Sequence, residues 1–424
     1  MEAAQAERVR IQHLVAGGDG FARADDGRVV FVAGALPGEL VDVSIVDDRR
    51  DFARARVVAI VEPSADRVEP ACEHRRVGCG GCGWMHLDVE AQFTAKLGVV
   101  AESLRRIGRF DSDEVDQLIV RGRAVDPAGY RTTIRVVGLD DGIGFREEGS
   151  DAVVPIDSCL VAHPRLAELL PELRVRPGVE LTLRTSVATG GTTALWSVPT
   201  SKRRSGRRPA PTTDRDGDGG GARPVEGLPR WVHIGPRAFL TERIDGIDLR
   251  VSAPSFFQPG AAAAEALVAA VGTAVPEAAT ADHLVDAYGG VGLFAATVGR
   301  HAAHVTLVES SRTSTADAGL NLGERARIER SEFARWARSR HPEARQIDAV
   351  IADPARSGLG KPGVKAVDTL DAPVVALVSC DPVSMARDAA LLTEVGYRPE
   401  RIEVIDLFPQ TPHVEVVTRF TRHR

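Results

Sequence analysis

The sequence predicts an α/β protein whose C-terminal part is a doubly wound parallel sheet, preceded by a small OB-like β-barrel and a β-rich central domain. Three patterns lead to this prediction. From about residue 252, short apolar runs alternate with helical patterns, which is typical of a parallel sheet covered by helices. Before residue 62, β-branched runs lie close together between Gly-rich turns. Between these parts, residues 119–198 form alternating runs with Gly and Pro breaks.

Length and composition set the limits for function. A chain of 424 residues predicts two or three domains. With 53 basic and 59 acidic residues, a nucleic-acid partner would have to bind local basic patches. No apolar run is long enough for a membrane span, and the first residues lack the pattern of a signal peptide. We therefore expect a cytoplasmic protein without membrane contact, in which disulfides are rare.

We divide the chain into three domains. Residues 1–65 form the barrel, residues 66–250 the central domain and residues 251–424 the doubly wound domain. Residues 90–109 read as an amphipathic helix with a basic end, and this helix could pack on the C-terminal domain. Residues 201–227 are of low complexity, basic first and then rich in Asp and Gly, which predicts a solvated surface loop.

The C-terminal domain can be assigned element by element. The predicted helices are 261–271, 292–298, 315–322, one after 361, and 382–395, and the predicted strands are 283–287, 304–308, 347–352, 373–378, 402–407 and 414–420. The last two strands are joined only by loop 408–413 and can pair antiparallel at one edge of the sheet.

The strongest catalytic candidate is Cys380, which follows the apolar run 373–378. In open α/β sheets, chemistry collects where strands end and loops begin. Glu415 follows a Pro-bounded loop and could place a carboxylate at the same edge. A thiol with a carboxylate suits a reaction in which one group attacks and the other removes a proton. The alternative is a buried structural cysteine and a solvated glutamate.

A glycine turn after strand 283–287 predicts a nucleotide-type ligand site. Gly290 lies in the run Asp286-Ala-Tyr-Gly-Gly-Val-Gly292, where glycines let the backbone approach a ligand. Glu309 ends the next strand and could accept hydrogen bonds from a ribose. The spacing also fits a dinucleotide fingerprint, so an NAD or FAD enzyme is an alternative. Asp286 and the antiparallel ending favour S-adenosylmethionine. Asp353 starts an Asp-Pro turn at the same sheet edge.

These motifs together resemble the RNA uracil-C5 methyltransferase family, over nearly the whole chain. The family's Ser-Cys-Asn-Pro motif is Ser379-Cys-Asp-Pro382 here, and its closing motif is present from Asp406 to Glu415. Its Phe-Phe-Gln element is Phe256-Phe-Gln258. The glycine-rich segment 17–39 resembles a TRAM domain, an RNA-binding barrel. The chain departs from the family at Ala355 for Pro, Asp381 for Asn and Gly289 for Cys, and it shows no clear acidic residue near Ser331 for the adenine end of the cofactor.

The resemblance implies a role for each site residue. The Cys380 thiolate would add to C6 of uracil, and Glu415 would remove the proton from C5. Gln258, Tyr288, Gly290 and Glu309 would contact S-adenosylmethionine, and Asp353 would hydrogen-bond within the cofactor–uracil site. The implied partner is RNA, with 23S rRNA favoured over tRNA by the barrel and the cysteine motif together. No protein partner is implied, and we expect a monomer.

The resemblance also implies a metal site. Cys72, Cys79, Cys82 and Cys159 resemble the four thiolate ligands of a [4Fe–4S] cluster, although the family's first spacing is one residue shorter. A tetrahedral zinc ion is the alternative, and a reduced, metal-free set is the simplest interpretation. We favour the cluster, because the spacing of the cysteines resembles the cluster-bearing branch of the family. We expect its role to be structural, because methyl transfer needs no electrons.

Two other functions compete with methyl transfer. The first is an iron–sulfur oxidoreductase with a dinucleotide-binding fold, and the second is an RNA-binding protein that has lost catalysis. Cys380 and Glu415 in their family context argue against both.

Overall fold

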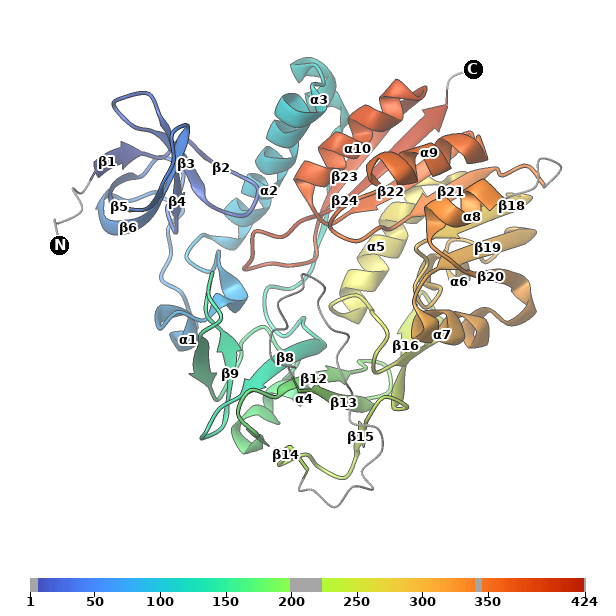
Figure 1. The fold of residues 1–424 in the computed structure, drawn as a ribbon, viewed down its shortest axis with the longest axis horizontal. Coiled ribbons are helices and arrows are strands. Elements are labelled where there is room, and N and C mark those ends of the chain that lie inside the picture. The colour runs from blue at the N-terminus through green and yellow to red at the C-terminus, as the bar shows by residue number, and fades with distance from the viewer. Residues whose placement is uncertain (1–6, 199–222, 340–344, 423–424) are drawn as a thin grey trace.

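The computed structural model describes residues 7–198, 223–339 and 345–422, which form the three lobes visible in Figure 1. Most of the low-complexity segment predicted as a loop, residues 201–222, lies outside the described residues. Among the helices that the structure describes, none combines the length and apolar character needed to cross a membrane.

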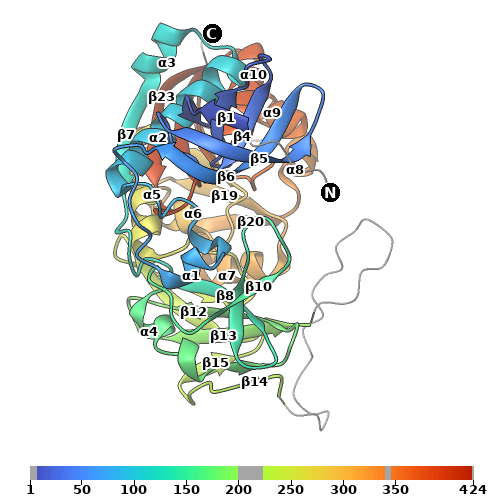
Figure 2. The same cartoon turned by 90° about the vertical axis from the view of Figure 1, so that its left-hand side faces the viewer.

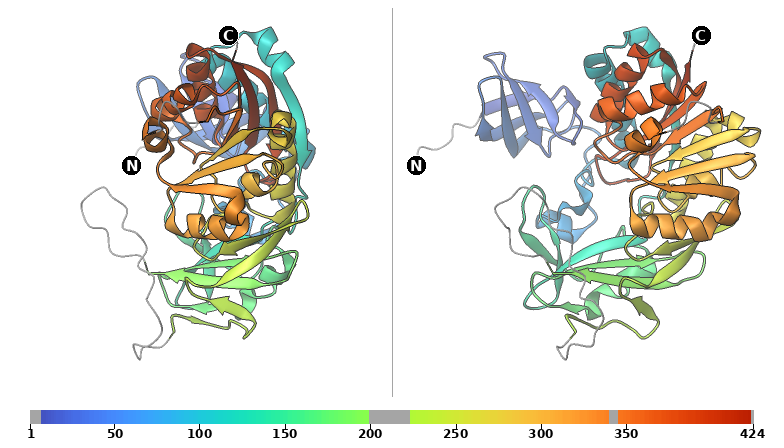
Figure 3. Two further views of the ribbon diagram at one scale, coloured as in Figure 1. Left: turned by 90° about the vertical axis from the view of Figure 1, so that its right-hand side faces the viewer. Right: turned by 45° about the vertical axis from the view of Figure 1, so that its right-hand side comes forward.

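The N-terminal lobe is a six-stranded sheet with the order β1-β5-β6-β4-β3-β2. Its strands are β1 Glu7–Arg10, β2 His13–Leu14, β3 Gly20–Arg23, β4 Val29–Ala33, β5 Leu40–Asp48 and β6 Phe52–Glu62. Side chains alternate in and out along each strand, so that Val30 and Val32 are fully buried while Phe31 between them lies on the outer face. This lobe is the predicted β-barrel, and it projects to one side of the molecule in Figure 3.

The central lobe contains a second six-stranded sheet, with the order β10-β9-β8-β12-β13-β15. Its strands are β8 Thr133–Gly138, β9 Ile143–Arg146, β10 Val153–Ile156, β12 Glu180–Thr185, β13 Thr192–Ser197 and β15 Val232–Ile234. The short elements beside it are β11 Arg174–Val175, β14 Val225–Glu226, α4 Pro164–Ala167 and η3 Leu170–Glu172. Two single-turn helices, α1 Glu73–Arg76 and η1 Gly80–Cys82, lie in the segment between the barrel and this sheet. Figure 2 shows the central sheet below the barrel and the C-terminal lobe.

The third lobe is built on an eight-stranded sheet with the order β20-β19-β18-β21-β22-β24-β23-β7. Its strands are β7 Ile119–Ala124, β18 His283–Ala287, β19 His304–Glu309, β20 Ala326–Arg330, β21 Ala349–Ala352, β22 Val374–Ser379, β23 Tyr397–Asp406 and β24 Glu415–Arg422. Strand β24 lies between β22 and β23 and is antiparallel to both, while the pairs from β20 to β22 are parallel. The predicted doubly wound sheet with an antiparallel ending is confirmed.

Helices cover both faces of this sheet. Its helices are α2 Val89–Ser103, η2 Leu104–Gly108, α3 Ser112–Leu118, α5 Ala261–Ala274, η4 Pro276–Ala279, α6 Leu293–Ala296, α7 Arg312–Leu322, η5 Gly323–Arg325, α8 Phe333–Ser339, α9 Gly360–Leu370 and α10 Pro382–Glu394. Along β22, Val375 and Leu377 join the core under α2, α8, α9 and α10, whereas Ala376 and Val378 join the core under α5, α6 and α7. Burial on both faces explains why the strands read as continuous apolar runs.

The N-terminal half contributes to the C-terminal lobe. Strand β7 pairs in parallel with β23 at the sheet edge, and α2 packs in the core that covers one face. The sequence division places residues 119–124 in the central domain, whereas the structure adds them to the C-terminal sheet. The hairpin of β16 Phe239–Ile244 and β17 Ile247–Ser252 connects the central lobe to α5.

Candidate active site

The ends of neighbouring strands bring the sequence candidates to one edge of the sheet. Ala287 of β18 pairs with Ala352 of β21, so the glycine turn and Asp353 leave the sheet side by side. Ser379 of β22 pairs with Val416 of β24 in antiparallel register. Continuing that register by one residue sets Cys380 opposite Glu415. A thiol, two carboxyl groups and a glycine turn therefore share this edge.

Burial changes the proton affinity of these groups. Burial raises the pKa of Cys380 to about 11, and the neighbouring Glu415 and Asp353 add to this rise. Burial also raises the pKa of Glu415 well above its usual range, with Asp353 as the next cause, and it raises the pKa of Asp353 to about 7. All three groups therefore hold their protons more tightly than they would in water, and perturbed carboxyl groups of this kind are typical of acid–base sites.

Arg356 provides the opposing positive charge. Its guanidinium lowers the pKa of both Cys380 and Glu415, which means that it favours their charged forms. It also lies 3.3 Å from Nε2 of His413. Burial lowers the pKa of His413 to about 4, with Arg356 as the second cause, so this imidazole is neutral at pH 7.

The glycine turn has the shape of a ligand cradle. An added Cβ on Gly289 would lie 2.7 Å from Leu307, whereas one on Gly290 would meet nothing within 4 Å. Gly290 has a φ of +56° and donates its N–H to Glu309 at 3.2 Å. Asp286 is fully buried, and its Oδ1 has no hydrogen-bond partner among the described residues. Open space, an unpaired acceptor and a strand-end carboxylate fit a nucleoside-type ligand.

The other two cofactor candidates are Gln258, which comes from outside the glycine run, and Tyr288, which lies within it. Gln258 is buried and follows the exposed ring of Phe256. Tyr288 lies just before the two glycines with a φ of +62°, and its ring packs on Phe333 with centroids 5.4 Å apart. Tyr288 thus closes one side of the turn.

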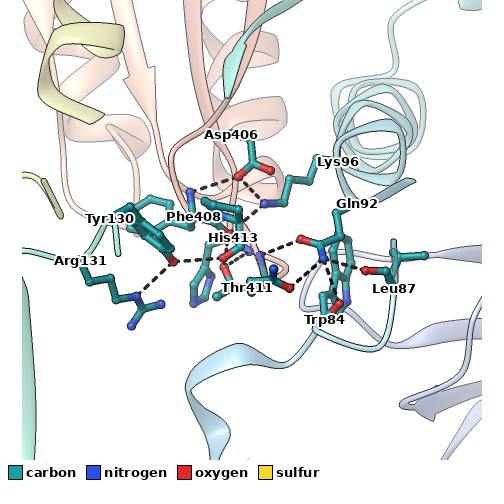
Figure 4. Close-up of polar contacts among 12 residues, drawn as sticks. Trp84, Leu87, Gln92, Lys96, Tyr130, Arg131, Asp406, Phe408, Thr411 and His413 are labelled. Atoms are coloured by element: carbon teal, nitrogen blue, oxygen red, sulfur yellow. Dashed lines mark hydrogen bonds and ion pairs between the residues drawn. The ribbon is translucent and has the colours of Figure 1, made fainter. Parts of the chain in front are cut away.

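The loop that leads into Glu415 is anchored by residues from the N-terminal half, as Figure 4 shows. Lys96 of α2 donates to Oδ1 of Asp406 at 2.6 Å and to the carbonyl of Phe408 at 3.0 Å. Gln92, one turn earlier, exchanges hydrogen bonds with Gln410. Lys96 and Asp406 are both almost completely buried, so this ion pair is shielded from water.

The four remaining cysteines lie apart from the strand-end residues, beside the central sheet. Burial raises the pKa of Cys82 to about 12, and Cys159, Cys79 and Cys72 each add to the rise, so the four thiols lie within electrostatic range of one another. Among the residues described, no three His, Cys, Asp or Glu side chains are spaced to hold a metal ion. The nearby guanidinium of Arg131 opposes the rise in the pKa of Cys82.

The structure brings the strand-end candidates of the sequence to one edge and adds residues that the sequence does not single out. Arg356 and His413, which belong to the Asp-Pro turn and to the closing motif, lie beside them. Gln92 and Lys96 were not singled out, because a residue on an amphipathic helix carries no signal of a partner more than 300 positions away.

Comparisons with known proteins agree with this arrangement. Residues 4–58 match the TRAM domain. An uncharacterized RNA methyltransferase of Streptomyces avermitilis is 34% identical over 96% of this chain and 96% of its own. The 23S rRNA (uracil(1939)-C(5))-methyltransferase of Chromohalobacter salexigens is 32% identical over 99% of this chain and 90% of its own.

A solved structure covers the same three lobes. The tRNA (uracil-54, C5)-methyltransferase of Pyrococcus abyssi, in complex with S-adenosyl-L-homocysteine, has a TM-score of 0.68 and 25% identity and covers 98% of this chain and 100% of its own. The N-terminal barrel, the doubly wound sheet with its antiparallel ending and these relatives lead to one conclusion: the chain belongs to the RNA uracil-C5 methyltransferases, class I enzymes that depend on S-adenosylmethionine.

Proposed function

We propose that this chain methylates C5 of a uridine in 23S rRNA through a covalent bond between Cys380 and C6 of the base. The observation that carries the proposal is the register of β22 and β24, which sets Cys380 opposite Glu415 beside the glycine turn. The 23S rRNA enzyme of Chromohalobacter salexigens is 32% identical, which supports rRNA as the substrate. The likeness to the tRNA enzyme of Pyrococcus abyssi makes tRNA the second candidate.

The chemistry explains why a thiol and a carboxylate are needed. S-adenosylmethionine supplies an electrophilic methyl group, but C5 of uracil is a weak nucleophile. When the Cys380 thiolate bonds to C6, the C5–C6 π electrons move to C5 and O4 as an enolate. C5 then bonds to the methyl carbon, and the sulfonium sulfur leaves with the electron pair of the bond that it loses.

Glu415 completes the cycle as the general base. Its carboxylate takes the proton from C5, and the electrons of the C5–H bond re-form the C5–C6 double bond. The C6–S bond then breaks, and its electron pair returns to the sulfur of Cys380. The raised pKa of Glu415 supports this role, since a carboxylate with a raised pKa is a stronger base than an ordinary glutamate. Arg356 would stabilise the thiolate and the carboxylate in turn.

The residues around the glycine turn fit the cofactor. Glu309 would hold ribose hydroxyls, and the backbone at Gly290 leaves room for the nucleoside. Gln258 and Tyr288 would orient the methionine end, and Asp353 would hydrogen-bond between cofactor and uracil. These assignments rest on the placement of the residues at one sheet edge and on the family motif.

The outer face of the barrel supplies a surface for RNA. His13, Phe21, Phe31 and Arg54 are direct cross-strand partners on β2, β3, β4 and β6. The rings of Phe31 and Phe52 lie 5.9 Å apart, and both are half-buried. The half-buried rings of Phe31 and Phe52 beside the guanidinium of Arg54 suit single-stranded RNA, because bases stack on aromatic rings while phosphates meet the charge, whereas the ring of Phe21 is buried. We call these five residues, His13, Phe21, Phe31, Phe52 and Arg54, the ring row.

We also propose that Cys72, Cys79, Cys82 and Cys159 hold a [4Fe–4S] cluster with a structural role. Four thiols from two distant segments lie within electrostatic range, which fits the ligand number of a cluster. A tetrahedral zinc ion is the alternative, since four thiolates also suit that ion.

The three-part division of the chain stays part of this proposal. The barrel at 1–65 would hold RNA, the part 66–250 would hold the cluster, and the part 251–424 would hold the cofactor and target base. Strand β7 and helix α2 belong with the last part through their packing.

One experiment tests the proposed function directly. RNA with 5-fluorouridine at the target should trap the wild-type enzyme as an adduct that survives denaturation, since fluorine cannot leave as a cation. Peptide mass mapping should place the adduct on Cys380. A 23S rRNA fragment should react and a tRNA transcript should not. An adduct on another cysteine would overturn the mechanism, and an adduct formed only with tRNA would overturn the choice of substrate.

A further inference from the structure

Gln410 is the residue by which the loop between β23 and β24 is held. Its φ of +68° is unusual for a residue with a side chain. Its backbone N–H donates to Oε1 of Gln92 at 2.7 Å, and its side-chain oxygen accepts from Nε2 of Gln92 at 3.1 Å. Its backbone carbonyl accepts from the backbone N–H of Trp84 at 2.9 Å. Three polar groups of one loop residue are thus bonded to the N-terminal half of the chain.

The two preceding residues are held in the same way. The carbonyl of Phe408 accepts from Lys96, and the carbonyl of Pro409 accepts from the hydroxyl of Tyr130 at 3.1 Å. Three consecutive loop carbonyls, at 408, 409 and 410, therefore each accept a hydrogen bond from a residue in the range 84–130. Glu415 begins β24 five residues after Gln410, so these bonds determine where the chain enters that strand.

The barrel touches this junction directly. The indole N–H of Trp84 donates to the carbonyl of Gly18 at 3.1 Å. A Cβ on Gly18 would lie 2.8 Å from Cβ of Pro412 and 2.8 Å from the indole nitrogen, so only glycine allows this approach. Gly18 has a φ of +100°, which also favours glycine.

The same barrel turn is tied to the ring row. Asp19, next to Gly18, forms an ion pair with Arg54 at 3.0 Å, and Arg54 is a member of that row. A chain of contacts therefore runs from the face proposed for RNA through Arg54, Asp19 and Gly18 to Trp84 and the loop.

We infer that Trp84 and Gln92 are positioning residues, which hold loop 407–414 so that Glu415 is aligned with the C5 proton when the barrel engages RNA. This inference rests on the proposed function. Neither residue belongs to the strand-end site, and both would act only through the loop. The step that depends most directly on them is removal of the C5 proton, because Glu415 follows the loop, whereas Cys380 follows β22 and reaches the loop through Arg356 and His413.

The test separates these two steps in the full-length protein. Gln92→Ala removes both bonds to the side chain and N–H of Gln410, and Gln117→Ala, an exposed glutamine of α3, is the matched control. Trp84→Phe keeps a ring and removes the bond to Gly18. Gln410→Gly keeps the left-handed backbone and removes the side-chain bond, which provides a second route if Gln92→Ala folds poorly. Two rates are measured: turnover on RNA with ordinary uridine, and adduct formation on RNA with 5-fluorouridine.

We expect turnover of Gln92→Ala to fall by roughly ten- to a hundredfold, the scale caused by misplacing a reacting group by about 1 Å. The rate of adduct formation should stay within about twofold of wild type, since that reaction omits proton removal. Methylated adduct should then build up on ordinary RNA. Trp84→Phe and Gln410→Gly should show the same split to a smaller extent, and Gln117→Ala should show none.

Two results would overturn the inference: equal losses of both rates in Gln92→Ala and Gln410→Gly, or wild-type turnover in both. A wild-type enzyme that forms no adduct with fluorinated RNA would instead refute the proposed function, so the two failures can be told apart.

Discussion

The carboxylate of Asp317 in α7 accepts a hydrogen bond from the hydroxyl of Ser255 at 2.7 Å. It also accepts from the N–H and the hydroxyl of Ser252, at 2.8 and 2.7 Å. Asp317 is almost fully buried, and its helix begins just after Glu309. The Asp317 carboxylate therefore joins two parts of the chain. One is the helix that follows Glu309, and the other is the segment that leads into Gln258. Glu309 and Gln258 are both residues of the proposed cofactor site.

Replacing Asp317 with Asn should weaken cofactor binding. The change removes the charge that strengthens these hydrogen bonds, and bonds to charged groups contribute about 1.5–3 kcal/mol each. If one such bond is lost, the Kd for S-adenosylmethionine should rise by roughly tenfold, measured by calorimetry. Asp248→Asn on the exposed β16–β17 hairpin is the control, because it pairs only with the surface residue Arg243. If Asp317→Asn binds S-adenosylmethionine as tightly as wild type, the Asp317 carboxylate does not support the cofactor site.

Substitutions of Cys380 and Glu415 should fail in different ways. Cys380→Ala should bind RNA and cofactor yet form neither product nor adduct, because nothing adds to C6. Glu415→Gln should still add and methylate, and then stall, because the C5 proton cannot leave. A denaturation-resistant adduct that carries the transferred methyl should accumulate, and labelled cofactor with gel electrophoresis will detect it. Full turnover by Cys380→Ala would contradict the assignment.

The sequence was sufficient where a local pattern carries the structure. Strand β22 is an uninterrupted apolar run because both of its faces are buried, so it could be read directly. Strand β20, with the sequence Ala-Arg-Ile-Glu-Arg, is not predicted from the sequence, because it is only five residues long, three of them charged, and lacks the continuous apolar run of the inner strands. Helix α8 is not predicted either, because seven residues are too few to show a clear helical pattern.

The supports of the site could not be read from the sequence. Strand β7 joins the C-terminal sheet from almost 280 residues upstream of its partner β23, and nothing within it indicates that pairing. Lys96 looks like one more charge on an amphipathic helix, yet it is buried against Asp406. Motifs reveal the groups that react, whereas the residues that hold them are defined by tertiary contact.

Activity should fall as the pH is lowered, because Glu415 becomes protonated. Glu415 must be deprotonated to accept the C5 proton, and burial and Asp353 raise its pKa. The loss of kcat should therefore begin at a higher pH than for an ordinary glutamate. Asp353→Asn removes the neighbouring charge and should move the acidic limb of the profile to lower pH, although the overall rate will fall. A limb that does not move would show that Asp353 and Glu415 are not coupled.

The free energy of unfolding should fall as the pH rises through the acidic range. An acid in a salt bridge would have the opposite effect. The pKa values of Asp286 and Asp353 are raised to about 7, so the folded state holds protons that the unfolded state has released. The free energy of unfolding should therefore fall as the pH rises from about 4 to about 7. Asp353→Asn should make this decline shallower in urea titrations at pH 5 and pH 7.5, and an unchanged slope would contradict the shift.

The ring row should bind RNA through base stacking. Phe31→Leu and Phe52→Leu keep apolar volume but remove the aromatic face, and each should cost about 1–3 kcal/mol in affinity for single-stranded RNA. Cofactor binding should not change. Phe239→Leu is the control, since its ring also lies under an arginine, Arg250, but on the β16–β17 hairpin. Equal losses from Phe239→Leu would place the RNA surface elsewhere.

The cysteine site should contain iron and sulfide. Protein purified without oxygen should be brown and lose its colour in Cys79→Ser and Cys159→Ser, while Cys380→Ala should keep it, since Cys380 lies in the separate strand-end site. Cys79 is buried next to the central sheet, and its backbone forms an isolated β-bridge with that of Glu147, just after β9. Loss of the cluster should therefore lower the soluble yield. The rate of adduct formation per folded molecule should change little, because no electron is transferred. One zinc ion per chain without iron would support the alternative that Cys82 and its three neighbours bind a single ion.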